Sequence, residues 1–92
     1  MVKVQLGGNI SIEGFEGMEP AKVIVAKKMI GLFAKKTGVA MGSLDAFDVK
    51  LSGDSITIHA KAGARVLEEK AEDKNVFVAL SNALSAIIEK AK

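Results

Sequence analysis

Apolar and polar residues alternate at the start of the chain. In residues 2–6 every second side chain is apolar, and this two-residue period is typical of a strand with one buried face. We expect this first strand to resume through Ile10 and Ile12, after the flexible Gly7-Gly8 pair.

A helical period replaces the alternation after a loop that Gly14 and Gly17 indicate. Pro20 suits the first helical turn, because it needs no backbone N–H there. We predict a helix from Pro20 to Lys36, with Gly38 as its C-terminal cap. The apolar residues that share one side of this helix, and that should pack on the sheet, are Val23, Ala26, Met29, Ile30 and Phe33.

Alternation returns in residues 47–51 and again in residues 56–60, with a Ser52-Gly53-Asp54 turn between them. This pattern predicts a hairpin of the second and third strands. A fourth, more charged strand should run from about Ala64 to Lys70. Because Val66 and Leu67 are adjacent, its facing is ambiguous, and we expect an edge position or a bulge.

The last segment has helical spacing, and Asp73 or Asn75 can cap it. Its apolar residues are Phe77, Leu80, Leu84, Ile87 and Ile88. The resulting order, β-α-β-β-β-α, predicts an α+β fold in which two helices pack on one face of a four-stranded mixed sheet. We expect residues 1–92 to form a single domain.

The composition is that of a folded protein, with 49% hydrophobic and 26% charged residues. The absence of cysteine excludes disulfides, thiolate metal sites and thiol nucleophiles. The N-terminus lacks a signal-peptide pattern, and no apolar run approaches the roughly 20 residues that span a bilayer. We therefore expect a cytoplasmic protein without a membrane partner.

Charge is unevenly distributed, although the net charge is only +2. The rest of the chain holds eight basic and eleven acidic residues, whereas Pro20 to Leu44 contains five lysines and no acid. These lysines are Lys22, Lys27, Lys28, Lys35 and Lys36. On the helical wheel, two of them, Lys28 and Lys35, lie opposite the apolar side.

The lysine-rich helix has two interpretations. It is a solvated polar face, or it is a surface that binds a polyanion. The lack of compensating acids favours the second, since solubility is usually served by mixed signs, and a phosphate backbone is the commonest partner. Because tyrosine and tryptophan are absent, base stacking is not expected, and recognition should involve backbone and shape.

Candidate chemistry is sparse. His59, the only histidine, shares a strand face with Thr57 and Lys61, and we expect it to face solvent. The acids of residues 68–73 lack calcium-loop spacing, and the glycines of residues 7–8 and 38–42 lack phosphate-loop spacing. We predict neither catalytic nor metal-binding residues, no cofactor and no enzymatic activity.

Several local motifs resemble the ribosome hibernation promoting factor family, also called ribosome-associated inhibitors or sigma-54 modulation proteins. Val4-Gln5-Leu6-Gly7-Gly8-Asn9-Ile10 resembles the family's first strand and turn, and Val25-x-x-Lys28-Met29-x-x-Leu32 its first-helix pattern. Ile56-Thr57-Ile58-His59 is similar to the third strand. Leu67 to Ala71 and Asn75-x-Phe77-x-Ala79-Leu80-Ser81 resemble the fourth strand and the start of the last helix.

This resemblance implies binding to ribosomal RNA in the decoding channel of the small subunit, where basic side chains block messenger and transfer RNA. Lys28 matches the family's helix-one lysine. We therefore expect an RNA-binding translation inhibitor or stress factor whose contacts are the five lysines together with Lys90. The alternative is a protein–protein interaction module or homodimer of the same fold without ribosome binding.

Overall fold

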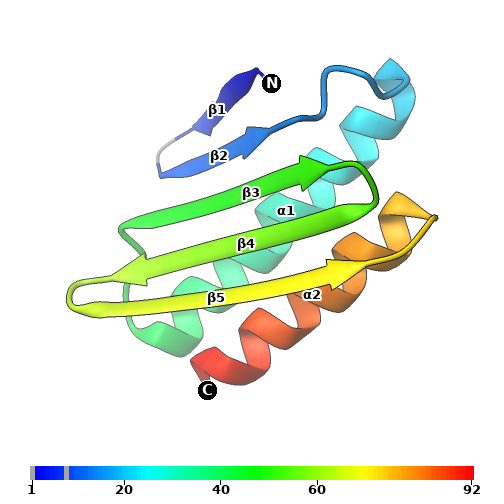
Figure 1. Cartoon of the computed structure of the whole chain (residues 1–92). Coiled ribbons are helices and arrows are strands. Elements are labelled where there is room, and N and C mark those ends of the chain that lie inside the picture. The colour runs from blue at the N-terminus through cyan, green and yellow to red at the C-terminus, as the bar shows by residue number, and fades with distance from the viewer. Residues whose placement is uncertain (1, 8) are drawn as a thin grey trace.

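The computed structural model describes residues 2–7 and 9–92, which contain five strands and two helices (Figure 1). The strands are β1 (Lys3–Gly7), β2 (Ile10–Glu13), β3 (Ala46–Ser52), β4 (Ser55–Ala62) and β5 (Arg65–Glu72). The helices are α1 (Pro20–Met41) and α2 (Val76–Ala91).

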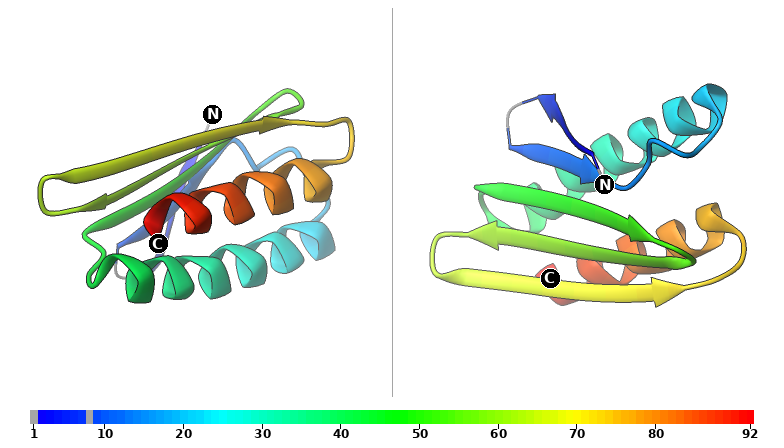
Figure 2. Two further views of the ribbon diagram at one scale, coloured as in Figure 1. Left: turned by 90° about the horizontal axis from the view of Figure 1, so that it is seen from below. Right: turned by 45° about the horizontal axis from the view of Figure 1, so that its top comes forward.

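All five strands belong to one sheet, in the order β1-β2-β3-β4-β5. Strands β2 and β3 are parallel, and the other neighbours are antiparallel. Both helices lie on the same face of the sheet (Figure 2, left). The predicted α+β class, the mixed sheet and the placement of the helices are confirmed.

The predicted number of strands is wrong, because the first strand is in fact a hairpin. The chain reverses direction between Gly7 and Ile10, so that Val4 pairs with Ile12 in antiparallel register. Gly7 has φ of 120°, a conformation that side-chain-bearing residues rarely adopt. A continuous strand would need extended backbone at that point. Gly8, the second residue of the predicted flexible pair, lies outside the described residues.

Helix α1 is also longer than predicted, since it runs through Gly38 to Met41. The buried Thr37 hydroxyl donates to the Phe33 carbonyl, 2.8 Å away, within the helix. Gly42 takes the cap instead: it has φ of 85°, and its N–H donates to the Val39 carbonyl at 3.3 Å. A glycine within a helix costs only about 1 kcal/mol relative to alanine, too little to end a helix that packs well.

Asn75, one of the two predicted caps, is the N-terminal cap of helix α2. The Asn75 side chain accepts a hydrogen bond of 2.9 Å from the Phe77 N–H, while the Asp73 carboxylate accepts from the Asn75 N–H. The helix packs over the sheet and contributes large side chains to a single core. The largest fully buried residues are Ile12, Ile30, Phe47, Val49, Ile56, Ile58, Leu80, Leu84 and Ile87.

Strand β5 lies at the sheet edge, which was one of the two expected alternatives. The other was a bulge, but the register of β5 with β4 is regular. Its partly buried Leu67 and Ala71 pack against the core, whereas Val66 is exposed. The other edge of the sheet is β1.

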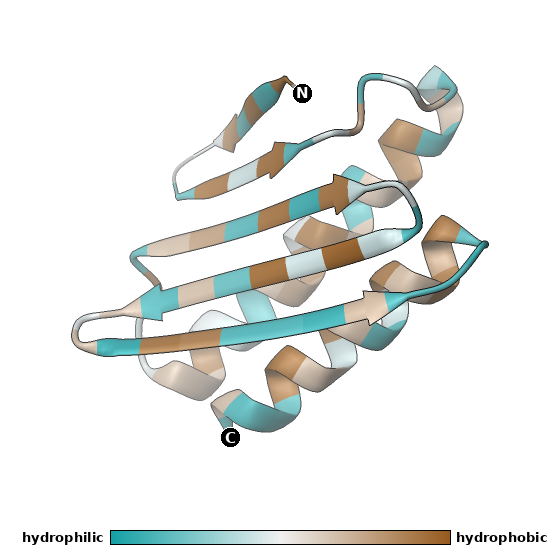
Figure 3. Ribbon diagram, viewed as in Figure 1, coloured by the Kyte–Doolittle hydropathy of each residue, from teal (hydrophilic) through white to brown (hydrophobic). Residues whose placement is uncertain are grey.

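Hydrophobic and hydrophilic residues alternate along β2, β3 and β4 (Figure 3), and the face of the sheet that carries no helix is mainly polar. Cross-strand ion pairs join Lys50 to Glu13 at 3.8 Å and His59 to Glu68 at 3.3 Å, and the Ser11 hydroxyl donates to the Asp48 carboxylate. Positive and negative side chains alternate on this face, so it can remain exposed to solvent. Within residues 2–7 and 9–92, neither helix combines the length and the apolar character needed to cross a membrane.

Candidate nucleic-acid interface

All five lysines of α1 are exposed. Lys28 and Lys35, seven residues apart, lie about 10 Å from each other along the helix axis on the side that faces away from the core. Lys27 lies on the flank toward β1, where it lines a cavity with Val4. Lys22 and Lys36 lie on the flank toward α2, where they line open pockets together with Asn75 and Glu89 respectively. The lysines therefore surround the exposed part of the helix rather than forming one row.

None of these five ammonium groups has a carboxylate within ion-pair distance among the described residues. Lys36 instead lies 5.3 Å from the centroid of the Phe33 ring, a cation–π contact that leaves its charge uncompensated. The 22-residue helix contains no acid. Its charge is therefore wholly positive and lies between Lys22 and Lys36, because the last turn holds no basic residue.

Lys90, the sixth predicted contact residue, is placed differently. Its Nζ lies 2.7 Å from the Glu69 carboxylate and donates to the Glu68 carbonyl at 3.0 Å. Both partners belong to β5, so the side chain joins the C-terminal end of α2 to the sheet edge. The structure thus separates Lys90 from the α1 lysines and gives its charge a partner.

The outward side of α1 also exposes apolar residues, which the sequence analysis did not anticipate. Val25, Leu32 and Val39 recur every seven residues and are 49%, 52% and 79% exposed. They lie beside Lys28 and Lys35 on the helical wheel. The signal was present in the sequence as a second apolar series on the lysine side, but it becomes informative only once the packed side is known.

His59 is exposed on the open face of the sheet, as predicted, with its Nε2 facing the carboxylate of its cross-strand neighbour Glu68. Across the described part of the chain, no three histidine, aspartate or glutamate side chains gather in a way that could hold a metal ion.

Neither a protein-family model nor a curated protein matches the sequence. The structure is similar to the crystal structure of the N-terminal domain of Protein Y from Thermus thermophilus, with a TM-score of 0.62 and 14% identity. The alignment covers 91% of this chain and 92% of that domain. At 14% sequence identity, this likeness shows a shared fold and no more.

Proposed function

We propose that the protein binds the RNA of the small ribosomal subunit through α1 and acts as a translation inhibitor or stress factor by occupying the RNA channel. The observation that carries this proposal is the set of five exposed lysines, none of which forms an ion pair with a carboxylate in the described part of the chain. The sequence motifs and the Protein Y fold support the choice of the ribosome among RNA partners.

The binding is electrostatic in this account. Each lysine that neutralises a phosphate releases counterions, so affinity falls as salt rises. With five phosphate contacts, affinity should fall on the order of a hundredfold between 50 and 200 mM salt. Lys90 is not part of the proposed contact, because its charge is already compensated by Glu69.

Gradient co-sedimentation with purified small subunits at low salt tests the proposal. The parent protein should migrate with the subunits, and the double variant Lys28→Glu/Lys35→Glu should remain at the top of the gradient. The matched control is Lys61→Glu/Lys70→Glu, which makes the same change in charge at exposed lysines of the sheet. Failure of the parent to sediment with subunits, or equal loss in both double variants, would contradict the proposal.

A second candidate is favoured by the exposed apolar series of α1. Val25, Leu32 and Val39 fit a partner helix whose apolar residues lie beside acids that pair with Lys28 and Lys35. A second copy of this chain is a poor occupant, because a symmetric contact through this face would bring its lysines together. The Leu32→Gln variant separates the two candidates: RNA binding should be unchanged, whereas binding of an acidic helix should weaken about tenfold.

A further inference from the structure

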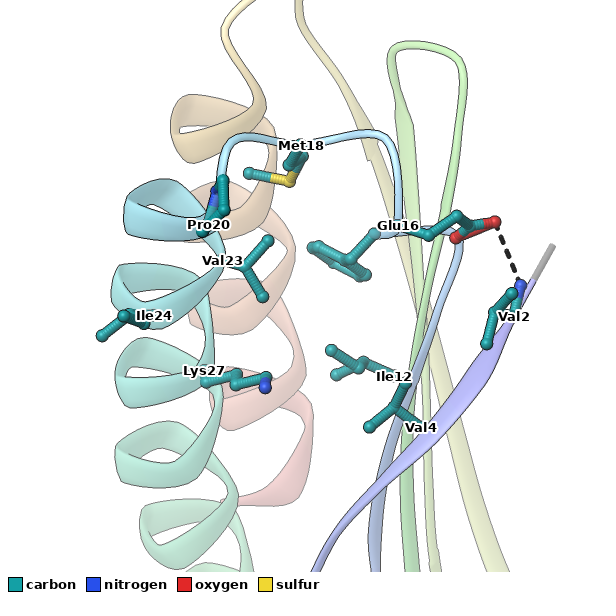
Figure 4. Close-up of a pocket in the computed structure, with 10 residues that line it drawn as sticks. Val2, Val4, Ile12, Glu16, Met18, Pro20, Val23, Ile24 and Lys27 are labelled. Atoms are coloured by element: carbon teal, nitrogen blue, oxygen red, sulfur yellow. Dashed lines mark hydrogen bonds between the residues drawn. The ribbon is translucent and has the colours of Figure 1, made fainter.

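The N-terminal hairpin and the start of α1 enclose a cavity of about 380 Å³ (Figure 4). Strand β1 lies at the sheet edge, and this cavity separates its inward side from α1. For that reason Val2 and Val4 are 55% and 40% exposed, although Ile12, which is paired with Val4, is only 2% exposed. The volume of the cavity falls within the roughly 300–1,000 Å³ range of small-molecule sites.

The wall of this cavity is mostly apolar. Ile12 and Phe15 are buried and belong to the core, while Met18 and Val23 close the side toward the loop and α1. Binding of an apolar group here is favourable, because it removes the surface of the group and of the valines from water.

Two charged residues line the cavity, and they differ in their partners. The Glu16 carboxylate accepts a hydrogen bond of 3.0 Å from the Val2 N–H at one end. Lys27 extends from α1 toward Ile12 and Val4 (Figure 4), and none of the described carboxylates lies within ion-pair distance of its ammonium group. The cavity thus combines an apolar wall with one available cation.

We propose that this cavity binds a small amphipathic monoanion, such as a medium-chain carboxylate, with its tail against Val4, Ile12 and Phe15 and its anionic head at Lys27. A single ammonium group matches a single negative charge. An apolar tail that adds to the core would also hold β1 more firmly against α1. This inference goes beyond RNA binding and does not depend on it.

Three probes of equal chain length test the charge requirement: octanoate, octanol and octylammonium. Titrations are followed by the methyl NMR signals of Val4, Ile12 and Val23, in the absence of RNA. Octanoate should shift these signals at the lowest concentration and octylammonium at the highest. Equal affinity for the three probes, or no shift with octanoate, would overturn the proposal.

The variant Lys27→Met keeps the apolar stem and removes the charge. It should weaken octanoate binding about fivefold and leave octanol binding unchanged. The matched control is Lys28→Met, at the neighbouring exposed lysine, which should bind octanoate as the parent does. An unchanged octanoate affinity in Lys27→Met would assign no role to this ammonium group and would contradict the proposed head-group site.

The variant Val4→Phe fills the cavity from an exposed position of the edge strand and should weaken octanoate and octanol alike. Val39 and Ile88, which line a separate groove between the helices, report on non-specific adsorption. Shifts of equal size in that groove would overturn the proposal. So would methyl shifts in the cavity on dilution without probe, because they would identify a second copy of the chain as the occupant.

Discussion

The two helices of this domain differ in how much of their surface the fold uses. Helix α2 buries six residues, including Leu80, Leu84 and Ile87, and its basic Lys90 is paired with Glu69. The longer α1 buries only Ile30 among its large residues, and within residues 2–7 and 9–92 its lysines form no ion pair with a carboxylate. We infer that α2 chiefly stabilises the fold, whereas α1 supplies a surface for binding.

The largest expected difference between the helices is in the free energy of unfolding that is lost when a leucine is replaced by alanine. Leu84 of α2 is fully buried, so Leu84→Ala should lower the free energy of unfolding by about 3 kcal/mol through lost burial and the resulting cavity. Leu32 of α1 is half exposed, and Leu32→Ala should change it by less than about 0.5 kcal/mol. Urea denaturation measures both, and similar losses would refute the division of roles.

The N-terminal caps should differ by a smaller amount. Asn75→Ala removes the side chain that accepts the Phe77 N–H and should cost about 1 kcal/mol. Glu19, at the corresponding position of α1, makes no side-chain cap hydrogen bond, and Glu19→Ala should have little effect. Thermal unfolding of the two variants checks this, and equal shifts in Tm would mean that the caps contribute alike.

Two glycines, one within α1 and one at its C-terminal cap, should change the stability in opposite directions when replaced by alanine. A Cβ at Gly31 meets open space, so Gly31→Ala should raise the free energy of unfolding by somewhat less than about 1 kcal/mol. Gly42→Ala should lower it by a similar amount, because φ of 85° is strained for alanine. If Gly31→Ala gains stability but loses RNA binding, a close approach by the RNA backbone at that position explains the glycine.

The smallest effect concerns Glu16, in the loop before α1. Hydrogen bonds from its own backbone N–H and from that of Val2 hold the pKa of this carboxyl below its ordinary value. A lowered folded-state pKa contributes stability that is complete above the ordinary glutamate pKa and is lost as the pH falls through the lowered one. The stability difference between the parent and Glu16→Gln should therefore shrink in acid. If the stability difference between the two proteins is independent of pH, ionised Glu16 does not stabilise the fold.

Much of the fold was predictable, because local signals agreed with one another. The β3–β4 hairpin has strict alternation around a Gly53 turn, and α2 has both a cap at Asn75 and a clear apolar series. The β1–β2 hairpin was missed because alternation alone does not say whether the chain reverses at Gly7. The end of α1 was missed because two glycines, at positions 38 and 42, could both serve as the cap.

The candidate site was predictable only in part. The helical wheel predicts that Lys28 and Lys35 point away from the packed side, and both are exposed in the structure. The partner of Lys90 depends on which face of β5 carries Glu69, which the adjacent Val66 and Leu67 left ambiguous. The cavity beside Lys27 depends on the space between the edge strand β1 and α1, a feature of the assembled fold that no local pattern contains.

The most direct test of the central claim is the salt dependence of binding to small ribosomal subunits. If Lys28 contacts a phosphate, Lys28→Ala should reduce the slope of log affinity against log salt by roughly one. Lys61→Ala, at an exposed lysine of β4, should leave that slope unchanged. A parent protein whose binding is insensitive to salt, or a Lys28→Ala variant with the parent's slope, would contradict the account of α1 as a phosphate-binding helix.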